Sequence, residues 1–339
     1  MDDTTTEWHL AERPQGEPDA DCFELQETEI RDPNPGELLV RVTYLSVDPY
    51  MRGRMSAGES YAEPWAVGDV LNGGIVGEVV ESRSEAYSEG DLVTGEGRWG
   101  EYSLLDAGEV APVDPAVADQ PAYLGTLGMP GRTAYFGLLE VGEPKPGDTV
   151  VVSGAAGAVG SVVGQIAKLN GCHVVGFAGS EEKVDWLTED LGFDAAINYK
   201  TTDDYSAALA EAAPEGVDVY FDNVGGPITD AVFPQLNLDA RVAVCGQIAH
   251  YNDETVPTGP RKLPQIIAPR ATVEGLLVGD FVTRFGEASE QLGQWVAAGD
   301  LQHRETVVEG LEQAPDAFLG LFSGDNIGKQ VVRVAAPSE

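Results

Sequence analysis

Basic residues are scarce in this chain of 339 residues, which carries 20 lysines and arginines against 57 aspartates and glutamates. The formal net charge of −37 repels phosphates and anionic lipid headgroups. We therefore expect neither a nucleic acid nor a membrane surface as a partner. The acids run from Asp2 to Glu339 without a terminal block, which disfavours an interaction tail and indicates a carboxylate coat over the whole surface.

Lysine is the rarer base, with only six residues in the chain. A dense carboxylate coat that is poor in lysine resembles the proteins of organisms that accumulate salt inside the cell. Such carboxylates hold water and counterions in concentrated salt, and they repel one another when the salt is diluted. The composition therefore predicts a halophilic protein, with a merely acidic mesophilic protein as the alternative.

Cysteine and histidine are too few and too scattered for a disulfide framework or a metal site. Three cysteines without a Cys-x-x-Cys pair, and four histidines without ligand spacing, predict neither feature. The N-terminal stretch, MDDTTTEWHL, lacks the apolar core of a signal peptide, and glycines interrupt the longest weakly polar run, residues 150–167. We therefore expect a soluble, cytoplasmic protein.

The remaining composition is that of a globular protein, with 42% hydrophobic residues and a length that suggests two domains. Short alternating runs in the first ~125 residues predict a small, mostly β domain. From about residue 130, expected strands alternate with expected helices, which predicts an α/β domain with a doubly wound parallel sheet. The expected strands are 148–152, 172–178, 195–198, 217–222, 241–245 and 272–278, and the expected helices are 159–169, 181–191, 205–212 and 281–298. A helix at 314–321 and a strand at 329–334 follow.

A glycine-rich turn follows the expected strand at 148–152. Gly154, Gly157 and Gly160 have the spacing G-x-x-G-x-x-G, which departs from G-x-G-x-x-G but lies in the same context, between a buried strand and a helix. Small residues there let the backbone approach a pyrophosphate, to which the helix N-terminus offers amide groups. The turn therefore predicts nucleotide binding, with a tight turn that holds no ligand as the alternative.

The end of the next expected strand indicates which nicotinamide cofactor binds. An NAD site places a carboxylate there for the ribose 2′-hydroxyl, whereas this chain has Ser180, and Lys183 one helical turn later can pair with a 2′-phosphate. The adjacent Glu181 and Glu182 could instead serve a ribose, and Lys183 could be a solvated residue. We favour NADPH because lysine is so scarce in this chain.

Three long stretches resemble the zinc-independent medium-chain dehydrogenases/reductases, and more narrowly the group of prostaglandin reductase and bacterial curcumin reductase. They are residues 45–52 (LSVDPYMR), 124–137 (LGTLGMPGRTAYFG) and 221–226 (FDNVGG). Residues 259–261 (GPR) and 274–278 (EGLLV) favour the curcumin-reductase branch. The resemblance covers nearly the whole chain.

The resemblance implies a GroES-like catalytic domain at 1–126, a Rossmann domain at 127–302 and a C-terminal segment, 303–339, that returns to the first domain. It implies NADPH-dependent reduction of the C=C bond of α,β-unsaturated ketones or aldehydes in a homodimer. A quinone reductase of the same superfamily is the alternative, and a non-catalytic NADPH-binding protein is a third. The expected partner is thus a small enone or quinone.

The resemblance also implies a set of cofactor residues. The pyrophosphate would contact Gly157, Ala158, Val159 and Gly160. The 2′-phosphate would lie near Ser180, Lys183 and Tyr199, and the adenosine or ribose near Asn223. The nicotinamide half is bordered by Cys245, Gly246, Gln247, Ile248, Tyr251, Leu276, Leu277, Val278 and, from the C-terminal segment, Asn326. Before the tyrosine, His250 replaces the small polar residue that is common in the family.

The chemistry without zinc needs a hydrogen-bond donor for the carbonyl oxygen. Hydride addition at the β-carbon of an enone places negative charge on that oxygen, and a positioned donor stabilises it. Tyr251 is the first catalytic candidate, together with the cofactor's ribose hydroxyl, and Tyr50 is the second. Tyr50 and Arg261 are expected to line the substrate pocket. Purely structural roles remain open for Tyr50 as a packed aromatic, for Asn223 as a turn former and for Tyr199 as a strand-end aromatic.

Overall fold

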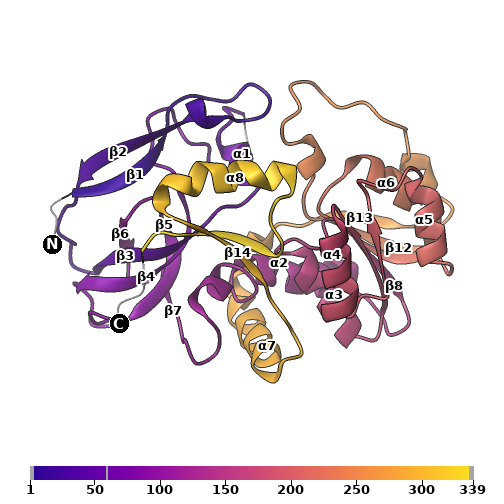
Figure 1. The fold of residues 1–339 in the computed structure, drawn as a ribbon. Helices are drawn as coiled ribbons and strands as arrows, with labels where there is room; N and C mark the ends of the chain where they lie inside the picture. The colour runs from indigo at the N-terminus through magenta and orange to yellow at the C-terminus, as the bar shows by residue number, and fades with distance from the viewer. Residues whose placement is uncertain (1–3, 59, 336–339) are drawn as a thin grey trace. The chain divides into compact units, whose positions relative to one another are not determined.

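The computed structural model describes residues 4–58 and 60–335, which divide into two compact units. The first unit consists of the residues up to Leu124, Asn252–Glu254, and the residues from Glu305 onward. The second unit consists of Gly125–Tyr251 and Thr255–Arg304. In Figure 1 the C-terminal strands and helix α8 lie among the elements of the first unit, whose chain therefore comes from both ends of the sequence.

The first unit is built on a mostly antiparallel sheet. Within the described residues, this sheet has the order β14-β15-β3-β4-β5-β7, with β6 also paired to β3, and β1 and β2 form a separate antiparallel pair. The strands are β1 (Thr4–Leu10), β2 (Phe23–Glu29), β3 (Glu37–Ser46), β4 (Asn72–Ser82), β5 (Leu92–Arg98), β6 (Tyr102–Asp106), β7 (Ala111–Pro112), β14 (Glu305–Glu309) and β15 (Lys329–Arg333). The helices are α1 (Met51–Arg54) and α8 (Ala314–Ser323).

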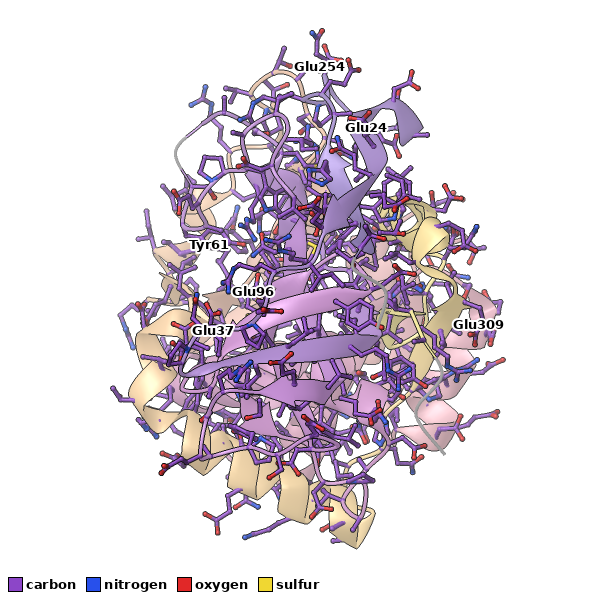
Figure 2. The ribbon with its side chains drawn as sticks, turned by 90° about the vertical axis from the view of Figure 1, so that its left-hand side faces the viewer. Glu24, Glu37, Tyr61, Glu96, Glu254 and Glu309 are labelled. Carbon is purple, nitrogen blue, oxygen red and sulfur yellow. The ribbon has the colours of Figure 1, made fainter. Side chains whose placement is uncertain are left out.

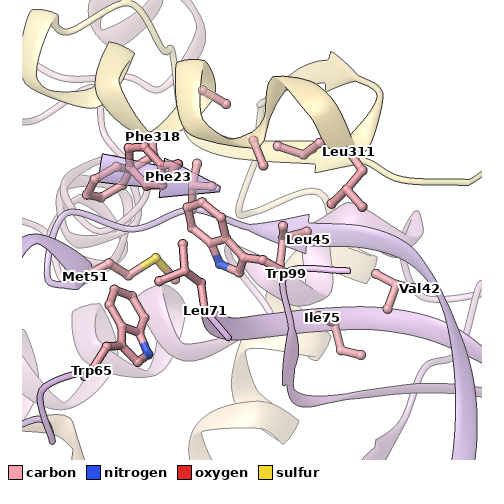
Figure 3. Packing of buried hydrophobic residues seen from close by; sticks show 14 of the residues in the cluster. Phe23, Val42, Leu45, Met51, Trp65, Leu71, Ile75, Trp99, Leu311 and Phe318 are labelled. Carbon is pink, nitrogen blue, oxygen red and sulfur yellow. The ribbon is translucent and has the colours of Figure 1, made fainter. Parts of the chain in front are cut away.

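Aromatic side chains join the two ends of the chain in the core of this unit. Trp99 is 1% exposed and stacks on Phe23 with 6.4 Å between ring centroids. Phe318 of α8 contacts Trp99 edge to face at 6.1 Å. Figure 3 shows the Trp99 ring beside Leu45 and Leu71 of the same cluster, with Phe23 and Phe318 next to each other. Helix α8 is therefore held by burial of apolar surface, at about 25 cal/mol per Å² removed from water.

The second unit contains the parallel sheet predicted from the sequence. Its order is β10-β9-β8-β11-β12-β13, and every neighbouring pair in it is parallel. The strands are β8 (Thr149–Val152), β9 (His173–Ala178), β10 (Ala195–Asn198), β11 (Val217–Asp222), β12 (Leu236–Val244) and β13 (Thr272–Gly275). The helices are α2 (Met129–Phe136), α3 (Gly160–Leu169), α4 (Glu181–Asp185), α5 (Tyr205–Ala212), α6 (Gly226–Val232) and α7 (Phe285–Ala298).

Strand β8 shows why this sheet has helices on both faces. Val150, Val151 and Val152 are all 0% exposed, although neighbouring side chains of a strand point to opposite faces. Val151 packs in a cluster with Leu209 of α5 and with residues of α6, whereas α3 contacts β8 and β9. Helices therefore cover both faces of the sheet, as the predicted doubly wound fold requires, and they bury this continuous apolar run from both sides.

Several expected elements of the second unit have different bounds in the structure. The strand expected at 241–245 is β12, which begins at Leu236, and the helix expected at 181–191 is α4 followed by a π-helix at Trp186–Asp190. The strand expected at 272–278 ends at Gly275, and a 3₁₀ helix follows at Val278–Arg284. The Asp280 amide donates to the Leu277 carbonyl at 3.1 Å, so the chain turns where the apolar run reaches Gly279 and Asp280. The helix expected from 281 accordingly begins at Phe285. None of the helices in the described residues combines the length and apolar character that a bilayer crossing needs.

The carboxylates far outnumber the bases that could pair with them. With 57 acids and 20 bases, at least 37 acids, the difference of the two, have no base of their own. Figure 2 shows exposed carboxylates such as Glu24, Glu254 and Glu309 at the rim of the view. Surface ion pairs such as Arg31 with Glu37, at 2.6 Å, contribute little each, because water and salt screen the attraction. Repulsion among the remaining acids is therefore the main electrostatic effect at the surface.

We expect the melting temperature to fall when salt is diluted from molar concentration. Screening shortens the Debye length to about 3 Å at 1 M, from about 10 Å at 0.1 M, and thereby weakens repulsion among the surface carboxylates. Circular dichroism melts over a KCl series measure the effect, with a non-ionic osmolyte of matched osmolality as the control. A melting temperature that stays constant from dilute buffer to ~2 M KCl contradicts the halophilic interpretation.

Candidate active site

The carboxyl ends of the six parallel strands meet at one edge of the second unit's sheet. Doubly wound folds bind ligands at this edge because the loops that leave the strands converge there. Each cofactor segment predicted within this unit directly follows one strand: 157–160 after β8, Ser180 and Lys183 after β9, Tyr199 after β10, Asn223 after β11, 245–251 after β12 and 276–278 after β13. The topology thus brings these segments together.

The glycine-rich turn is tied to the strands on either side of β8. The Ser153 amide donates to the carbonyl of Phe221 in β11, and the Ala155 amide donates to that of Phe177 in β9. Helix α3 then begins at Gly160, where a Cβ atom would lie only 2.4 Å from the Gly154 carbonyl oxygen. A side chain there would push the turn and the helix apart. The turn therefore brings the amide groups at the start of α3 close to the sheet edge, in the arrangement that binds phosphates.

Ser180 caps the helix that follows β9. Its hydroxyl oxygen accepts a hydrogen bond from the Lys183 amide at 3.3 Å, which fixes the first turn of α4. Lys183 is half-buried in this turn and lies one turn beyond the tip of β9. Ser180 thus has a structural role that is compatible with its predicted position at a 2′-phosphate.

The two acids beside Lys183 are both engaged by other residues. Glu181 accepts a hydrogen bond from the side-chain amide of Asn198 at 2.6 Å, and Glu182 pairs with Arg304 at 3.0 Å. Both carboxylates therefore have a partner within the protein, although each keeps capacity for a further hydrogen bond.

Tyr199 lies over the end of β9. A Cβ atom on Gly179 would be 2.6 Å from the Tyr199 hydroxyl oxygen, so the phenol packs against the backbone that leads into Ser180. Burial raises the pKa of this phenol, which therefore stays protonated at neutral pH. The packing accounts for glycine at 179 and places a hydrogen-bond donor beside the β9 tip.

Asn223 connects the turn after β11 to the glycine-rich turn. Its side-chain amide donates to the Ser153 carbonyl at 2.8 Å, and its backbone amide donates to the Ser153 hydroxyl at 2.9 Å. The Asn223 carbonyl accepts from the Ile248 amide at 3.4 Å, which links it to the loop after β12. Asn223 thus acts as a turn former, and its Oδ1 atom is left for a further contact.

Tyr251 closes the loop that follows β12. The backbone amide of Gln247 donates to the Tyr251 hydroxyl oxygen at 3.3 Å, so the oxygen acts as an acceptor toward the protein and keeps its proton for another partner. Burial raises the pKa of the Tyr251 phenol, and the hydrogen bond from Gln247 opposes this shift. The group is therefore protonated at neutral pH and can donate a hydrogen bond at the sheet edge.

The remaining segments of the edge present mainly apolar surface. Burial raises the pKa of the Cys245 thiol to about 12, so it is not a reactive thiolate. Leu276 is buried against Gly137 and Phe221, and its side chain belongs to the core. Leu277, by contrast, is 43% exposed.

Three predicted residues lie outside this edge. Tyr50 and Asn326 belong to the first unit, where burial raises the pKa of the Tyr50 phenol and the Asn326 amide donates to the Gly328 carbonyl at 2.8 Å. Arg261 lies in the second unit and is exposed.

Two charged residues at the predicted motifs were missed by the sequence analysis. Asp222, which ends β11, is 1% exposed and accepts hydrogen bonds through both oxygens. Lys329 is 3% exposed; its ammonium group donates to the Val47 carbonyl at 2.8 Å and pairs with Asp48 at 3.0 Å. Lys329 therefore anchors the loop that leads to Tyr50. The sequence contains one weak indication for each residue: Asp222 belongs to the FDNVGG motif, and Lys329 is one of only six lysines in the chain.

No metal centre is visible in residues 4–58 and 60–335, since no three His, Cys, Asp or Glu side chains gather there in a way that could hold an ion. Cys22, Cys172 and Cys245 are free thiols. The donor groups that follow the parallel strands include backbone amides, hydroxyls and the lysines Lys183 and Lys200, which suit an anionic organic ligand.

Comparisons with known proteins agree with this architecture. A family model described as the N-terminal domain of oxidoreductase matches residues 6–113, and one described as zinc-binding dehydrogenase matches residues 158–296. The NADPH-dependent curcumin reductase of Escherichia coli (strain K12) is 45% identical over 333 residues, which cover 97% of this chain and 96% of the relative. The 2-alkenal reductase (NADP(+)-dependent) of Nicotiana tabacum is 47% identical over 301 residues, 88% of each chain.

Solved structures give the same result in three dimensions. The crystal structure of CurA in complex with NADPH from Vibrio vulnificus superposes with a TM-score of 0.92 and 44% identity, over 98% of this chain and 100% of the other. The matches confirm the fold class inferred from the sequence, a GroES-like β domain with a parallel-sheet Rossmann domain. The chain belongs to the medium-chain dehydrogenase/reductase family.

Proposed function

We propose that this protein reduces the C=C bond of α,β-unsaturated ketones and aldehydes with NADPH, without a metal. The observation that supports it most is the convergence of a helix N-terminus, Lys183 and a protonated Tyr251 at one edge of a parallel sheet. The curcumin reductase and the 2-alkenal reductase to which the chain is similar are both NADP-dependent enzymes. When bound, NADPH supplies the hydride for the β-carbon of the substrate.

The residues of the edge fit NADPH better than NADH. The turn at Gly160 leaves no space for a side chain, as a turn that closely approaches a pyrophosphate requires. At the β9 tip, Glu181 and Glu182 contact Asn198 and Arg304, and Lys183 belongs to the first turn of α4. In our proposal Lys183 and Tyr199 hold the 2′-phosphate, and Ser180 leaves space for it.

Tyr251 is the group that we assign to the substrate's carbonyl oxygen. Charge develops on this oxygen as the β-carbon accepts hydride, and a donor already in place stabilises it without reorganisation. The Gln247 amide donates to the phenol oxygen and helps to hold it in place, so the hydroxyl proton can serve the substrate. Tyr251 or a water molecule then delivers the proton that the α-carbon needs. Tyr50 and Arg261 are proposed to line the pocket that holds the rest of the substrate.

Lys183→Ala is expected to weaken NADPH binding by about 1–3 kcal/mol, because it removes a charge-assisted hydrogen bond to the 2′-phosphate. NADH binding should not change, since NADH has no phosphate at that position. Direct titration of both cofactors in high salt measures the difference. Lys168→Ala is the control, since Lys168 pairs with Asp194 near the C-terminal end of α3, at 2.7 Å, and its loss should affect both cofactors alike. Equal weakening of NADPH and NADH in Lys183→Ala would show that Lys183 does not recognise the phosphate.

Tyr251→Phe is expected to lower kcat on an enone about 10–100-fold, equivalent to ~1.4–2.7 kcal/mol of barrier, with little change in NADPH affinity. The substitution keeps the ring and its packing and removes only the donor. Because the pKa of the phenol is raised, the Tyr251-dependent part of kcat should be constant from pH 6 to about 9.

Tyr135→Phe is the control for this experiment, because the Tyr135 hydroxyl contacts Glu287 at 3.2 Å on α7 rather than the sheet edge. An enone panel and a quinone panel, both with NADPH in high salt, complete the test. Full kcat in Tyr251→Phe overturns its assignment. Turnover of quinones alone supports the quinone alternative, and NADPH binding without turnover of either panel supports a non-catalytic protein.

We further infer that the protein is a cytoplasmic homodimer that pairs along β13. This strand is the last in its sheet within the described residues, and all four of its residues are exposed. Of the twelve large hydrophobic side chains exposed in the described residues, seven lie between Leu238 and Val282. An exposed edge strand readily pairs with another strand, and a second copy offers the same strand. The three free thiols agree with a reducing compartment.

Val273→Lys is expected to shift the protein from dimer to monomer, because it replaces the exposed apolar side chain of the edge strand with an ammonium group that must stay hydrated. Sedimentation velocity at micromolar concentration in high salt measures the mass. Leu25→Lys is the matched control: Leu25 is 42% exposed on β2, and Val273 is 41% exposed on β13. A monomeric wild type, or a dimer that persists in Val273→Lys, rejects pairing along β13.

A further inference from the structure

Asp222 lies at the centre of the sheet edge, yet its role in the proposed mechanism is still undefined. It is the last residue of β11 and is 1% exposed. Its Oδ1 atom accepts hydrogen bonds from the hydroxyls of Ser153 and Tyr220, both at 2.9 Å, and from the amides of Val224 at 3.0 Å and Gly225 at 2.8 Å. A buried carboxylate is costly unless such donors surround it. Here the donors are Tyr220 of β11 itself and groups of the turns after β8 and β11.

The second oxygen connects this carboxylate to the loop that carries Tyr251. The Gln247 side chain donates to Asp222 Oδ2 at 2.9 Å, and the Gln247 backbone amide donates to the Tyr251 hydroxyl oxygen at 3.3 Å. Thr229 of α6 donates to the same Oδ2 atom at 2.7 Å. The backbone carbonyl of Asp222 also accepts the amides of Cys245 and Gly246, at 2.8 and 3.0 Å. One residue therefore holds the start and the middle of the 245–251 loop.

We propose that Asp222 is a positioning residue: it holds the turns after β8, β11 and β12 in the shape that receives the cofactor and, through Gln247, orients the Tyr251 phenol. The proposal rests on the assignment of this edge to NADPH and of Tyr251 to the reaction. Asp222 itself contacts neither cofactor nor substrate in this proposal. Its effect passes through Ser153, Asn223 and Gln247, whose positions depend on its two oxygens.

The chemistry of an amide explains why asparagine should not replace this residue. In Asp222→Asn one of the two acceptor oxygens becomes an NH₂ group. If this group takes the place of Oδ2, it faces the Thr229 hydroxyl and the Gln247 amide. If it takes the place of Oδ1, it faces the four donors to that atom. Thr229 can rotate its hydroxyl, but Gln247 can turn its amide over only by giving up its hydrogen bond to the Gly246 carbonyl. The 245–251 loop must therefore shift, and buried donors lose their partner.

The same strand provides a matched control at its other end. Asp218, near the start of β11, accepts the Thr149 amide at 2.8 Å and the Asn237 side-chain amide at 2.9 Å. Its hydrogen bonds join β11 to neighbouring strands at the amino end of the sheet, away from the proposed site. Asp218→Asn therefore costs stability in a similar way without disturbing the cofactor edge.

The test is direct NADPH titration and kcat at saturating NADPH, in high salt and well below each variant's melting temperature. We expect Asp222→Asn to raise the dissociation constant of NADPH and to lower kcat, each by about tenfold or more, as unsatisfied buried donors imply. Asp218→Asn should leave both within about twofold of wild type. Equal effects of the two variants, or a folded Asp222→Asn that binds and turns over like wild type, overturn the proposal.

Two milder variants decide the matter if Asp222→Asn does not fold. Thr229→Val removes one donor from outside the loops and should raise the NADPH dissociation constant about two- to tenfold. Gln247→Met breaks the link between Asp222 and the Tyr251 loop and should lower kcat more than NADPH affinity. Wild-type values for both variants refute the positioning role. Because the titration uses no substrate, a wild type that binds NADPH but reduces no enone rejects the proposed function alone.

Discussion

The parallel alignment of six strands is the constraint on which the site depends. It brings the carboxyl ends of β8 to β13 to one edge, so residues as distant in sequence as Gly157 and Leu277 belong to one surface. The ladder of backbone hydrogen bonds stops there, and the amides of the following turns need other acceptors. In this protein the acceptors include the Ser153 hydroxyl, the Ser180 hydroxyl and the carboxylate of Asp222. The polar groups that accept these amides at the ends of the strands thus also determine the shape of the binding surface.

The two aspartates of β11 have different roles at the two ends of the strand. Asp218 accepts one backbone amide and one side-chain amide and holds neighbouring strands in register. Asp222 accepts hydrogen bonds from the turns after β8 and β11 and from the loop after β12. These segments lie beyond the ends of the strands, where the hydrogen bonds of the sheet cannot hold them. A carboxylate suits the second position because it only accepts, and every group around it donates. Stability and function thus depend on the same residue type at opposite ends of one strand.

The sequence predicted those features that local patterns determine. The alternation of expected strands and helices from about residue 130 indicated a doubly wound parallel sheet, and the glycine spacing after the expected strand at 148–152 indicated a turn that closely approaches a ligand. The role of Lys329 could not be predicted in this way, because its partners Val47 and Asp48 lie about 280 residues earlier in the chain. Asp222 was visible within its motif, but its partners come from loops up to 69 residues away. Hydrogen bonds between distant segments leave no periodic signal.

The charge of the protein places a further demand on the groups at the sheet edge. NADPH carries several negative charges, and a net charge of −37 repels it at long range. Binding must therefore rely on contacts of hydrogen-bond length: amide groups at the start of α3, and Lys183 beside the β9 tip. Concentrated salt shortens the range of the repulsion to a few ångströms, whereas desolvated contacts at the edge are screened much less. An acidic surface and an anion-binding edge are thus compatible when salt is abundant. Salt screens the long-range repulsion between the surface carboxylates and NADPH, and it weakens the short hydrogen bonds that bind NADPH much less.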